Sequence, residues 1–365
     1  MKVAVRVKNL LKAVNICSRL VGSRSSLEVL GNILIETDKN VLKLSSTNLD
    51  LAITTKLGAK VEKEGRISIP ARLLGELVGS ISEDTLQLIA DDSKMTIKGS
   101  SIHSRLNGVS ATEFPTLPKL SSSKSISFNS ETLKSSLEKV LASVSSDESR
   151  PVLAGIYFSV NDKQMVLAGT DSYRLSEVKI VVTNTDTISC IIPVKTVSEL
   201  LRLISSEEAS KVDIMIGESE ICFIVGESQL ISQLTEGKYP DYKKIIPEKT
   251  TTTIECDKDK LQEAVKISSV FARESSHGIA LKVVKNELII DAQTSDVGEN
   301  TVNLDIKKSG QDTSININAK YITDILAVIQ DKTVNIGFNG KLDPLLITPK
   351  SKDKKEIHII MPLRS

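Results

Sequence analysis

The sequence predicts an α+β fold built from three similar modules, because three separate landmarks recur with one period. A glycine that opens a strand recurs at spacings of 124 and 123 residues: Gly31, Gly155 and Gly278. A threonine that ends the following strand recurs at spacings of 123 and 124 residues: Thr47, Thr170 and Thr294. An alternating strand that runs into a helix is the third landmark: ISIPARLLGELVGSI, CIIPVKTVSELLRLI and ININAKYITDILAVI. A period of about 123 residues has the size of a small domain rather than of a solenoid unit.

Each module has the order strand, helix, several strands, helix and several strands. The first helices are expected in LLKAVNICSRLV, LKSSLEKVLASV and LQEAVKISSVFA, where apolar residues recur at helical spacing. The Gly-led strands that follow are LGNILIET, AGIYFSV and HGIALKV. Pro70 and Pro193 lie near the starts of two second helices, where a missing N–H costs little. This order indicates mostly antiparallel sheets.

Polar, Ser- and Thr-rich segments mark the expected boundaries between modules. LSSSKSIS at 120–127 and PEKTTTT at 247–253 read as linkers. They divide the chain into domains at 1–120, 127–247 and 251–365. A row of like modules has two different ends, so head-to-tail contacts between copies produce a filament or a closed ring. A dimer of such chains would close a ring of six modules, and a plain three-domain monomer is the alternative.

The composition is that of an ordinary globular protein. Hydrophobic residues make up 40% and charged residues 25%, while aromatic residues reach only 3% and Trp is absent, so Ile, Leu and Val must build the cores. A net charge of +1 argues against a protein whose entire surface binds polyanions. The four cysteines form no CxxC pair. The segment MKVAVRVKNLL lacks the apolar core of a signal peptide and no run reaches membrane-span length, so we expect a cytoplasmic protein without membrane contact.

The stretch GTDSYRLS, residues 169–176, resembles a catalytic turn, and one hypothesis is an enzyme that uses Asp171, Tyr173 and Arg174. Its counterparts in the other modules, STNLDLAI and QTSDVGEN, repeat the turn but not those side chains. The three histidines are isolated, and no phosphate-binding loop or GxSxG motif occurs. We therefore expect no metal, no cofactor and no catalysis.

The predicted helices carry cations on their polar faces. They are Lys8, Lys12, Arg19, Lys134, Lys139, Lys260 and Lys266 on the first helices, and Arg72, Lys195, Arg202 and Lys320 on the second. If equivalent helices point the same way, these cations would follow a phosphate backbone without reading bases. A solvated charged face is the alternative, and charge alone does not decide.

Several motifs together, including the three-module period, resemble one family. Gly31-Asn32 after EVL, TDSYRL, KYPDYKKIIP and the terminal IIMPLRS are all similar to the beta subunit of bacterial DNA polymerase III, and the resemblance covers the whole chain. It implies a DNA clamp fold with antiparallel sheets outside and helices lining a central hole, closed as a head-to-tail homodimer around duplex DNA. It also implies a non-catalytic processivity factor whose partners are the replicative polymerase, the clamp loader and other clamp-binding proteins. A three-module protein-interaction scaffold without DNA encirclement is the alternative.

The resemblance implies site residues of three kinds. A peptide-binding pocket between domains 2 and 3 maps onto Leu153, Thr170, Ser172, Tyr173, Arg174, Leu175, Pro240, Lys244, Ile245, Asn318, Tyr321, Leu342, Ile359, Met361, Pro362, Leu363 and Arg364. DNA contacts map onto Arg24, Arg72, Arg150 and Lys195. The dimer interface maps onto Val270 and Phe271 in domain 3. The opposing strand in domain 1 is IHSRLNGV, and Leu106 is the residue of that strand expected in the interface.

The chain also departs from the family pattern. Ser172-Tyr173 stands where the family commonly has Gly-His, and Lys244 stands where it has Arg. Ser365 replaces a Leu or similar residue, and Pro151-Val152 replaces an aromatic pair found in some members.

Overall fold

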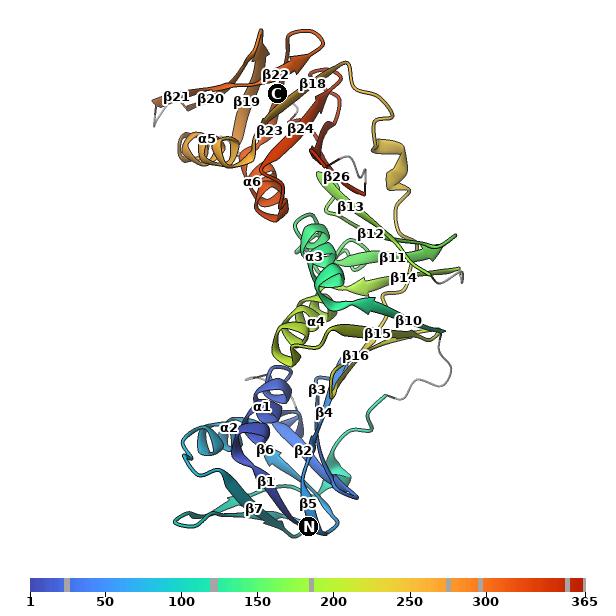
Figure 1. Ribbon diagram of the computed structural model, residues 1–365, viewed down its shortest axis with the longest axis vertical. Coiled ribbons are helices and arrows are strands. Elements are labelled where there is room, and N and C mark those ends of the chain that lie inside the picture. Colours follow the sequence, from blue (N-terminus) through green and yellow to red (C-terminus); the bar gives the residue numbers. More distant parts are fainter. Residues whose placement is uncertain are drawn as a thin grey trace. The chain divides into compact units, whose positions relative to one another are not determined.

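The computed structural model describes residues 1–22, 27–118, 124–183, 187–273, 277–294, 298–351 and 355–363. The chain divides into two compact units. Unit 1 contains Met1–Leu133 and Lys195–Leu234, and unit 2 contains Lys134–Val194 and Thr235–Ser365. Both combine helices with antiparallel sheets (Figure 1), which confirms the predicted α+β class.

Unit 1 has two sheets. The first has the strand order β5-β1-β7-β8-β9 and the second the order β10-β15-β16-β17-β4-β3-β2-β6. The strands are β1 (Lys2–Arg6), β2 (Asn32–Asp38), β3 (Val41–Thr47), β4 (Leu51–Gly58), β5 (Lys60–Lys63), β6 (Arg66–Pro70), β7 (Thr85–Ala90), β8 (Lys94–Lys98), β9 (His103–Asn107), β10 (Lys124–Asn129), β15 (Lys211–Ile216), β16 (Glu220–Val225) and β17 (Ser228–Gln233). Its helices are α1 (Val7–Ser18), α2 (Ala71–Gly79) and α4 (Val194–Glu207, all but its first residue), with short 3-10 turns η1 (Glu28–Gly31) and η2 (Ala111–Glu113).

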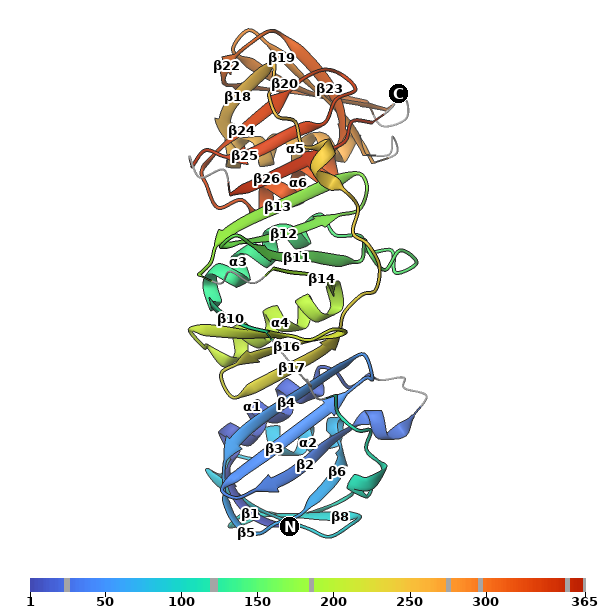
Figure 2. The same ribbon diagram turned by 90° about the vertical axis from the view of Figure 1, so that its right-hand side faces the viewer.

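Helix α1 covers one face of the larger sheet in unit 1. Its buried residues include Leu10, Val14 and Cys17, which recur at three-and-four spacing and form one apolar stripe. The stripe packs against β2, β3 and β4, and α2 packs beside α1 (Figure 2). The strands alternate between buried and more exposed positions where only one face meets the helices. In β1, for example, Val3 and Val5 are buried, whereas Lys2 and Ala4 are half-buried and Arg6 is exposed.

Unit 2 also has two sheets, with the orders β14-β11-β12-β13-β26-β25-β24-β18-β22 and β21-β20-β19-β23. The strands are β11 (Gly155–Asn161), β12 (Gln164–Thr170), β13 (Arg174–Val181), β14 (Ile188–Pro193), β18 (Thr252–Asp257), β19 (Gly278–Val284), β20 (Glu287–Thr294), β21 (Gly298–Asp305), β22 (Lys307–Ser309), β23 (Thr313–Asn318), β24 (Thr333–Phe338), β25 (Leu345–Pro349) and β26 (Glu356–Ile360). The helices are α5 (Lys258–Phe271), α6 (Ala319–Val328) and most of α3 (Ser130–Leu141), and η3 (Tyr242–Ile245) is a 3-10 turn.

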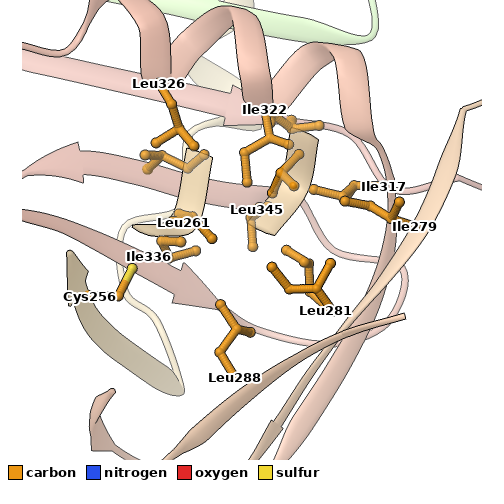
Figure 3. Close-up of a cluster of buried hydrophobic side chains, with 14 of the residues drawn as sticks. Cys256, Leu261, Ile279, Leu281, Leu288, Ile317, Ile322, Leu326, Ile336 and Leu345 are labelled. Carbon is orange, nitrogen blue, oxygen red and sulfur yellow. The ribbon is translucent and has the colours of Figure 1, made fainter. Parts of the chain in front are cut away.

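The core of the third repeat lies between α5, α6 and the strands of both sheets in unit 2. Figure 3 shows Leu261 from α5 and Ile322 and Leu326 from α6 directed at strand residues such as Leu281 and Leu345. All five side chains are fully buried. Aliphatic side chains fill this core almost alone, as the scarcity of aromatic residues predicts.

The six described helices fall where the repeat predicts them, and two strand pairs join one repeat to the next. Strand β4 pairs antiparallel with β17, with Leu51 opposite Ser232. Strand β13 pairs antiparallel with β26, with Arg174 opposite Ile360. We call these pairs the first junction, which lies in unit 1, and the second junction, which lies in unit 2. Continuous sheets across each junction leave no open edge there.

Candidate functional site

The turn after β12 is held by its own side chains. Thr170 Oγ1 donates to the Arg174 carbonyl oxygen at 2.6 Å and accepts from the Ser172 amide at 3.1 Å. Asp171 Oδ1 accepts from the amides of Tyr173 and Arg174 at 2.9 and 3.0 Å. Ser172 has a φ of 81°, the left-handed region that this tight reversal requires. The Thr and Asp of GTDSYRLS therefore shape the backbone.

The first repeat builds the same turn after β3. Thr47 Oγ1 donates to the Leu51 carbonyl oxygen at 2.7 Å and accepts from the Leu49 amide at 3.0 Å. Asn48 Oδ1 accepts from the amides of Asp50 and Leu51 at 3.2 and 2.8 Å. Leu49 has a φ of 79°, the counterpart of Ser172. In the third repeat, residues 295–297 lie outside the described residues. The turn is thus shared by at least two repeats, and what differs is the side chains that it presents.

In unit 2 this turn presents a buried arginine and two stacked tyrosines. Arg174 Nε donates to Asp171 Oδ2 at 3.0 Å, and its Nη1 donates to Asp324 Oδ2, in α6, at 2.6 Å. The guanidinium carbon lies 4.7 Å from the ring centroid of Tyr321. Tyr173 stacks on Tyr321 with centroids 6.3 Å apart and ring planes 20° apart, and its side chain is 58% exposed. Two carboxylates fix the arginine, and the exposed tyrosine forms an aromatic wall above it.

Beneath this wall lies an apolar cluster with three more tyrosines. Tyr157, Tyr239 and Tyr242 contact one another with centroid distances of 5.2 to 6.2 Å, and they pack with Leu175 and Ile359. Val152, Ile245, Leu346 and Met361 complete the cluster from its partly buried side.

The Tyr242 hydroxyl donates to Glu177 Oε2 at 2.7 Å. Burial and the neighbouring Glu177 carboxylate raise the pKa of Tyr242, so its hydroxyl stays protonated and keeps this hydrogen bond. The carboxylate thus has a partner inside the cluster.

The C-terminal segment forms the other side of the site. The Met361 amide donates to the Tyr173 carbonyl oxygen at 2.8 Å, and the Leu363 amide donates to the Asn316 carbonyl oxygen at 2.8 Å. Met361, Pro362 and Leu363 are partly exposed, and Leu342 is 73% exposed. The result is an apolar surface with a polar edge, the kind of surface into which a short peptide can place apolar side chains.

The structure brings most of the predicted pocket residues into this region of unit 2, with different degrees of access. Leu175 and Ile359 have no exposed surface, so they support the site from below and do not line it. Thr170 and Arg174 are also buried, while Leu153, Ile245, Asn318 and Tyr321 are partly exposed and Ser172, Tyr173, Pro240, Lys244 and Leu342 are exposed. Arg364 lies outside the described residues.

The four predicted DNA contacts have separate surroundings. Arg72 in α2 is 91% exposed and forms an ion pair with Glu76 at 2.8 Å. Arg150 pairs with Asp147 at 3.2 Å, and Lys195 is exposed in the first turn of α4. Arg24 lies outside the described residues.

Three of the helix cations form ion pairs across a junction, and Arg72, Arg202 and Lys320 form ion pairs with carboxylates of their own helices. Lys12 contacts Glu207 at 2.8 Å and Arg19 lies 3.6 Å from Glu199, both across the first junction. Lys139 contacts Glu356 across the second junction at 2.5 Å. Each of these three cations has a carboxylate partner from a distant part of the sequence, and the hypothesis that the helix cations follow a phosphate backbone stays a prediction.

The predicted dimer residues lie on or beside outer strands. Leu106 is in β9, the outer strand of its sheet, but its side chain is only 6% exposed. Val270 near the end of α5 is 49% exposed, and Phe271 packs partly against the core of the third repeat. Strand β21, which α5 contacts, is the outer strand of the four-stranded sheet.

Comparison with known proteins covers the whole chain. Sequence models of the DNA polymerase III beta subunit match in order: the N-terminal domain at residues 1–118, the central domain at 127–241 and the C-terminal domain at 243–364. The chain belongs to the DNA polymerase III beta subunit family. This family is non-catalytic, so the hypothesis of an enzyme built on Asp171, Tyr173 and Arg174 was wrong.

Curated relatives and solved structures agree. The beta sliding clamp of Chlamydia muridarum is 28% identical over 98% of this chain and 96% of its own length, and that of Synechocystis is 28% identical over 100% and 99%. A Pseudomonas aeruginosa sliding clamp solved with bound griselimycin has a TM-score of 0.95 and 25% identity, covering all of both chains. The Bacillus subtilis clamp, 24% identical, has a TM-score of 0.95 over 100% of this chain and 99% of its own. The three-domain clamp fold is thereby established.

Sequence reasoning missed the residues that hold the site from behind. Asp324, Tyr239 and Tyr242 had no role assigned, although KYPDYKKIIP contains both tyrosines. His358 was taken as isolated, yet it lies between Ser176 and Glu356. The spacing Glu356-x-His358 on one strand face was the available signal, because alternate residues of a strand share a face.

Within the described residues, no group of three or more potential metal ligands comes together. No described helix is both long and apolar enough to cross a membrane.

Proposed function

We propose that this protein is a sliding clamp that encircles duplex DNA as a head-to-tail homodimer and tethers the replicative polymerase in the bacterial cytoplasm. The observation that carries the proposal is the match of all three beta-subunit domains, in order, along the chain. A topological link explains why a polymerase partner needs no tight contact with DNA: enclosure, rather than affinity, retains the ring. Weak, sequence-independent contacts then permit sliding.

The two junctions indicate how the ring closes. In each, the strand that follows the turn held by Thr47 or Thr170 (the Thr turn) pairs with the last strand of the next repeat. These pairs are β4 with β17 and β13 with β26. The equivalent strands left over are β21 in the third repeat and β9 in the first, and both are outer strands. A second copy supplies a partner for each, which gives the two identical contacts of a closed head-to-tail dimer.

Charge supports this pairing. Strand β9 exposes His103 and Arg105, and the neighbouring β8 carries Lys94 and Lys98. Strand β21 exposes Glu299 and Asp305. A basic edge meeting an acidic edge favours the head-to-tail contact over contacts between like ends. Phe271→Ala, at the end of α5, is expected to shift the sedimentation coefficient towards that of a monomer; an unaltered dimer would remove Phe271 from the interface.

Arg72, Arg150 and Lys195, together with Arg24, are the proposed phosphate contacts. The three described ones are exposed, and the ion pairs of Arg72 and Arg150 are surface pairs that a phosphate can replace at little cost. Replacing all four with Ala is expected to weaken loading on DNA uniformly across sequences and to flatten its dependence on salt.

The second junction is the proposed site for peptides of the polymerase, the clamp loader and other clamp-binding proteins. Tyr173 and Tyr321 offer aromatic contacts beside the buried Arg174, Met361 packs against the tyrosine cluster, and the exposed Leu342 is a further proposed apolar contact. A rigid site that binds short flexible segments favours exchange of partners over permanent attachment.

The deciding experiment loads the protein on nicked circular DNA with a clamp loader and then cuts the circle. A ring held by topology is expected to leave promptly once free ends exist, at moderate salt. Retention on blunt linear DNA would contradict encirclement, and failure to associate with either form would favour an interaction scaffold without a DNA role.

A further inference from the structure

A chain of buried polar side chains lies behind the site at the second junction. The hydroxyls of Ser143 and Ser176 are 2.6 Å apart, and Ser176 Oγ lies 2.7 Å from His358 Nδ1. His358 Nε2 lies 3.0 Å from Glu356 Oε1, and Glu356 Oε2 contacts Lys139 at 2.5 Å. Ser143, Ser176 and His358 have no exposed surface. We call these five residues the His358 cluster; they tie α3 and its C-terminal extension to β13 and β26.

The cluster is charged as well as buried. Burial acts to raise the pKa of Glu356, but its hydrogen bond to His358, the charge of His358 and the Lys139 ammonium outweigh burial and hold the pKa below its ordinary value. Glu356 is therefore ionised at neutral pH with only 7% exposure. Buried ionic groups are a weak source of stability compared with apolar residues of similar volume, so stability alone does not account for the cluster.

The apolar residues of β26 do not fix its register by themselves. Ile359 packs into the tyrosine cluster and Ile360 into the core of the third repeat, so each face of the strand has an apolar residue, and the polar Glu356 and His358 share the face of Ile360. Ile357 repeats Ile359 on its face. The connection from Pro349 to Glu356 is too long to impose a register as a two-residue turn would. Strand β26 lies between β13 and β25, and a slip by two residues against both neighbours would keep every side chain on its present face.

Such a slip would disrupt the His358 cluster. With β26 moved so that Ile360 lies opposite Ser176, His358 would leave Ser176 and Glu356 would leave Lys139. A slip by two residues also displaces Met361 and Leu363 by about 6.6 Å along the strand. Their hydrogen bonds to Tyr173 and Asn316 would then be lost.

We propose that the His358 cluster sets the register of β26 and thereby positions Met361–Leu363 for peptide binding. His358 is a positioning residue, since it contacts no peptide itself. The proposal deepens the proposed peptide site and rests on it for the effect on affinity. The effect on register can be measured without any ligand.

Two double-cysteine reporters read the register. Lys179 and Lys355 lie opposite each other, with the Lys179 amide donating to the Lys355 carbonyl oxygen. Lys179→Cys with Lys355→Cys, the native-register reporter, therefore cross-links the native register, since directly opposed residues lie within disulfide reach. Val181→Cys with Lys355→Cys, the slipped-register reporter, cross-links the register slipped by two, and Val181 is 71% exposed. Peptide mapping separates these disulfides from the four natural cysteines.

Each reporter is combined with the natural cluster, with His358→Leu, and with Lys139→Met, Glu356→Leu and His358→Leu together. The natural cluster is expected to give the native cross-link alone. The slipped cross-link should rise with the single substitution and rise further with the triple one, to about half of the molecules, because two apolar registers of similar burial remain. A triple variant that forms only the native cross-link would overturn the proposal.

We propose that griselimycin, which is bound to the similar Pseudomonas aeruginosa clamp, also binds this peptide site, and its labelled form supplies the second readout. The triple variant is expected to bind about twofold or more weakly, in proportion to its native-register fraction, while its melting temperature does not fall. Oxidising the native-register reporter should restore the affinity. Loss of affinity that the disulfide does not restore would contradict positioning. Failure of the natural cluster protein to bind griselimycin would count against the proposed peptide site, while the cross-links would still decide the register.

Discussion

The two junctions of this chain have the same backbone arrangement but carry different side chains. Both join a strand after a Thr turn to the last strand of the next repeat, and both place a non-glycine residue at a φ near 80°: Leu49 in the first and Ser172 in the second. In the first junction the residue that follows the turn is Leu51, a buried aliphatic side chain; in the second it is Arg174. The repeat supplies the scaffold, and substitutions in one copy supply a binding site.

Their acidic residues are used differently too. In the first junction, Glu199 is 3% exposed and lies between Arg19 and Arg202. In the second, the α6 counterpart Asp324 holds Arg174 below Tyr321. An ion pair thus closes the first junction, whereas in the second it positions an aromatic surface that remains exposed. We expect ligands of the second junction alone.

The largest expected effect follows Arg174→Ala. It removes the shared partner of Asp171 and Asp324, while Asp324 keeps its ion pair with Lys320, so the free energy of unfolding should fall by about 2 kcal/mol. Griselimycin affinity should fall by about tenfold or more, because the Tyr321 ring loses its support. Urea denaturation followed by circular dichroism and calorimetric titration measure the two effects. Arg174→Lys keeps the positive charge but not the two-pronged guanidinium, so its stability and affinity should lie between those of the natural protein and Arg174→Ala. Unchanged affinity and stability in Arg174→Ala would contradict this role of Arg174.

Glu199→Ala is the matched change at the first junction. Removing this buried carboxylate leaves Arg19 without its ion pair, so unfolding should cost about 2 kcal/mol less. Griselimycin affinity should not change, because the first junction contributes nothing to the site. Glu76→Ala, which removes the exposed counterpart of Glu199 in α2, serves as the control with an effect under about 0.5 kcal/mol. Equal losses of affinity in Glu199→Ala and Arg174→Ala would erase the distinction between the junctions.

Tyr173→Ala should separate binding from stability. Its ring is exposed and stacks on Tyr321, so its loss should weaken griselimycin binding by about 1 kcal/mol while stability changes by less than about 0.5 kcal/mol. Asp50→Ala, at the same place in the first junction, is the control and should leave the affinity unchanged. A Tyr173→Ala variant with the griselimycin affinity of the natural protein would show that the Tyr173 ring takes no part in binding.

The smallest effects are expected from glycine in the two turns. Ser172→Gly and Leu49→Gly relieve the left-handed φ, and each should raise the free energy of unfolding by about 0.5 kcal/mol after the added freedom of the unfolded chain is subtracted. Asp50→Gly and Tyr173→Gly alter the next residue, which has no positive φ, and should destabilise. Thermal melts compare the four variants. Destabilisation by both Ser172→Gly and Leu49→Gly would mean that the side chains, rather than φ, matter in these turns.

The sequence predicts what is local or repeated, and less of what forms across repeats. Apolar residues at helical spacing locate the six described helices, and the Thr landmarks locate the shared turn, because periodicity and turn chemistry act over a few residues. The pairing of β13 with β26 is long-range, and no pattern in HIIMPLRS names its partner strand. Lys12, Arg19 and Lys139 look like free cations until their distant carboxylates are placed beside them. The pocket residues came from the resemblance, which does not distinguish Leu175, buried below the site, from Tyr173, exposed at its surface.

The measurement that tests this contrast most directly uses the absence of tryptophan from the chain. Tyr173→Trp places a single reporter at the second junction, where it can still stack on Tyr321, and Asp50→Trp places one at the matching position of the first. Titration with griselimycin, or with a C-terminal peptide of a replicative polymerase, is expected to change the emission at position 173 saturably and to leave position 50 unaffected. An equal response at both positions, or a response at position 50 alone, would contradict the account.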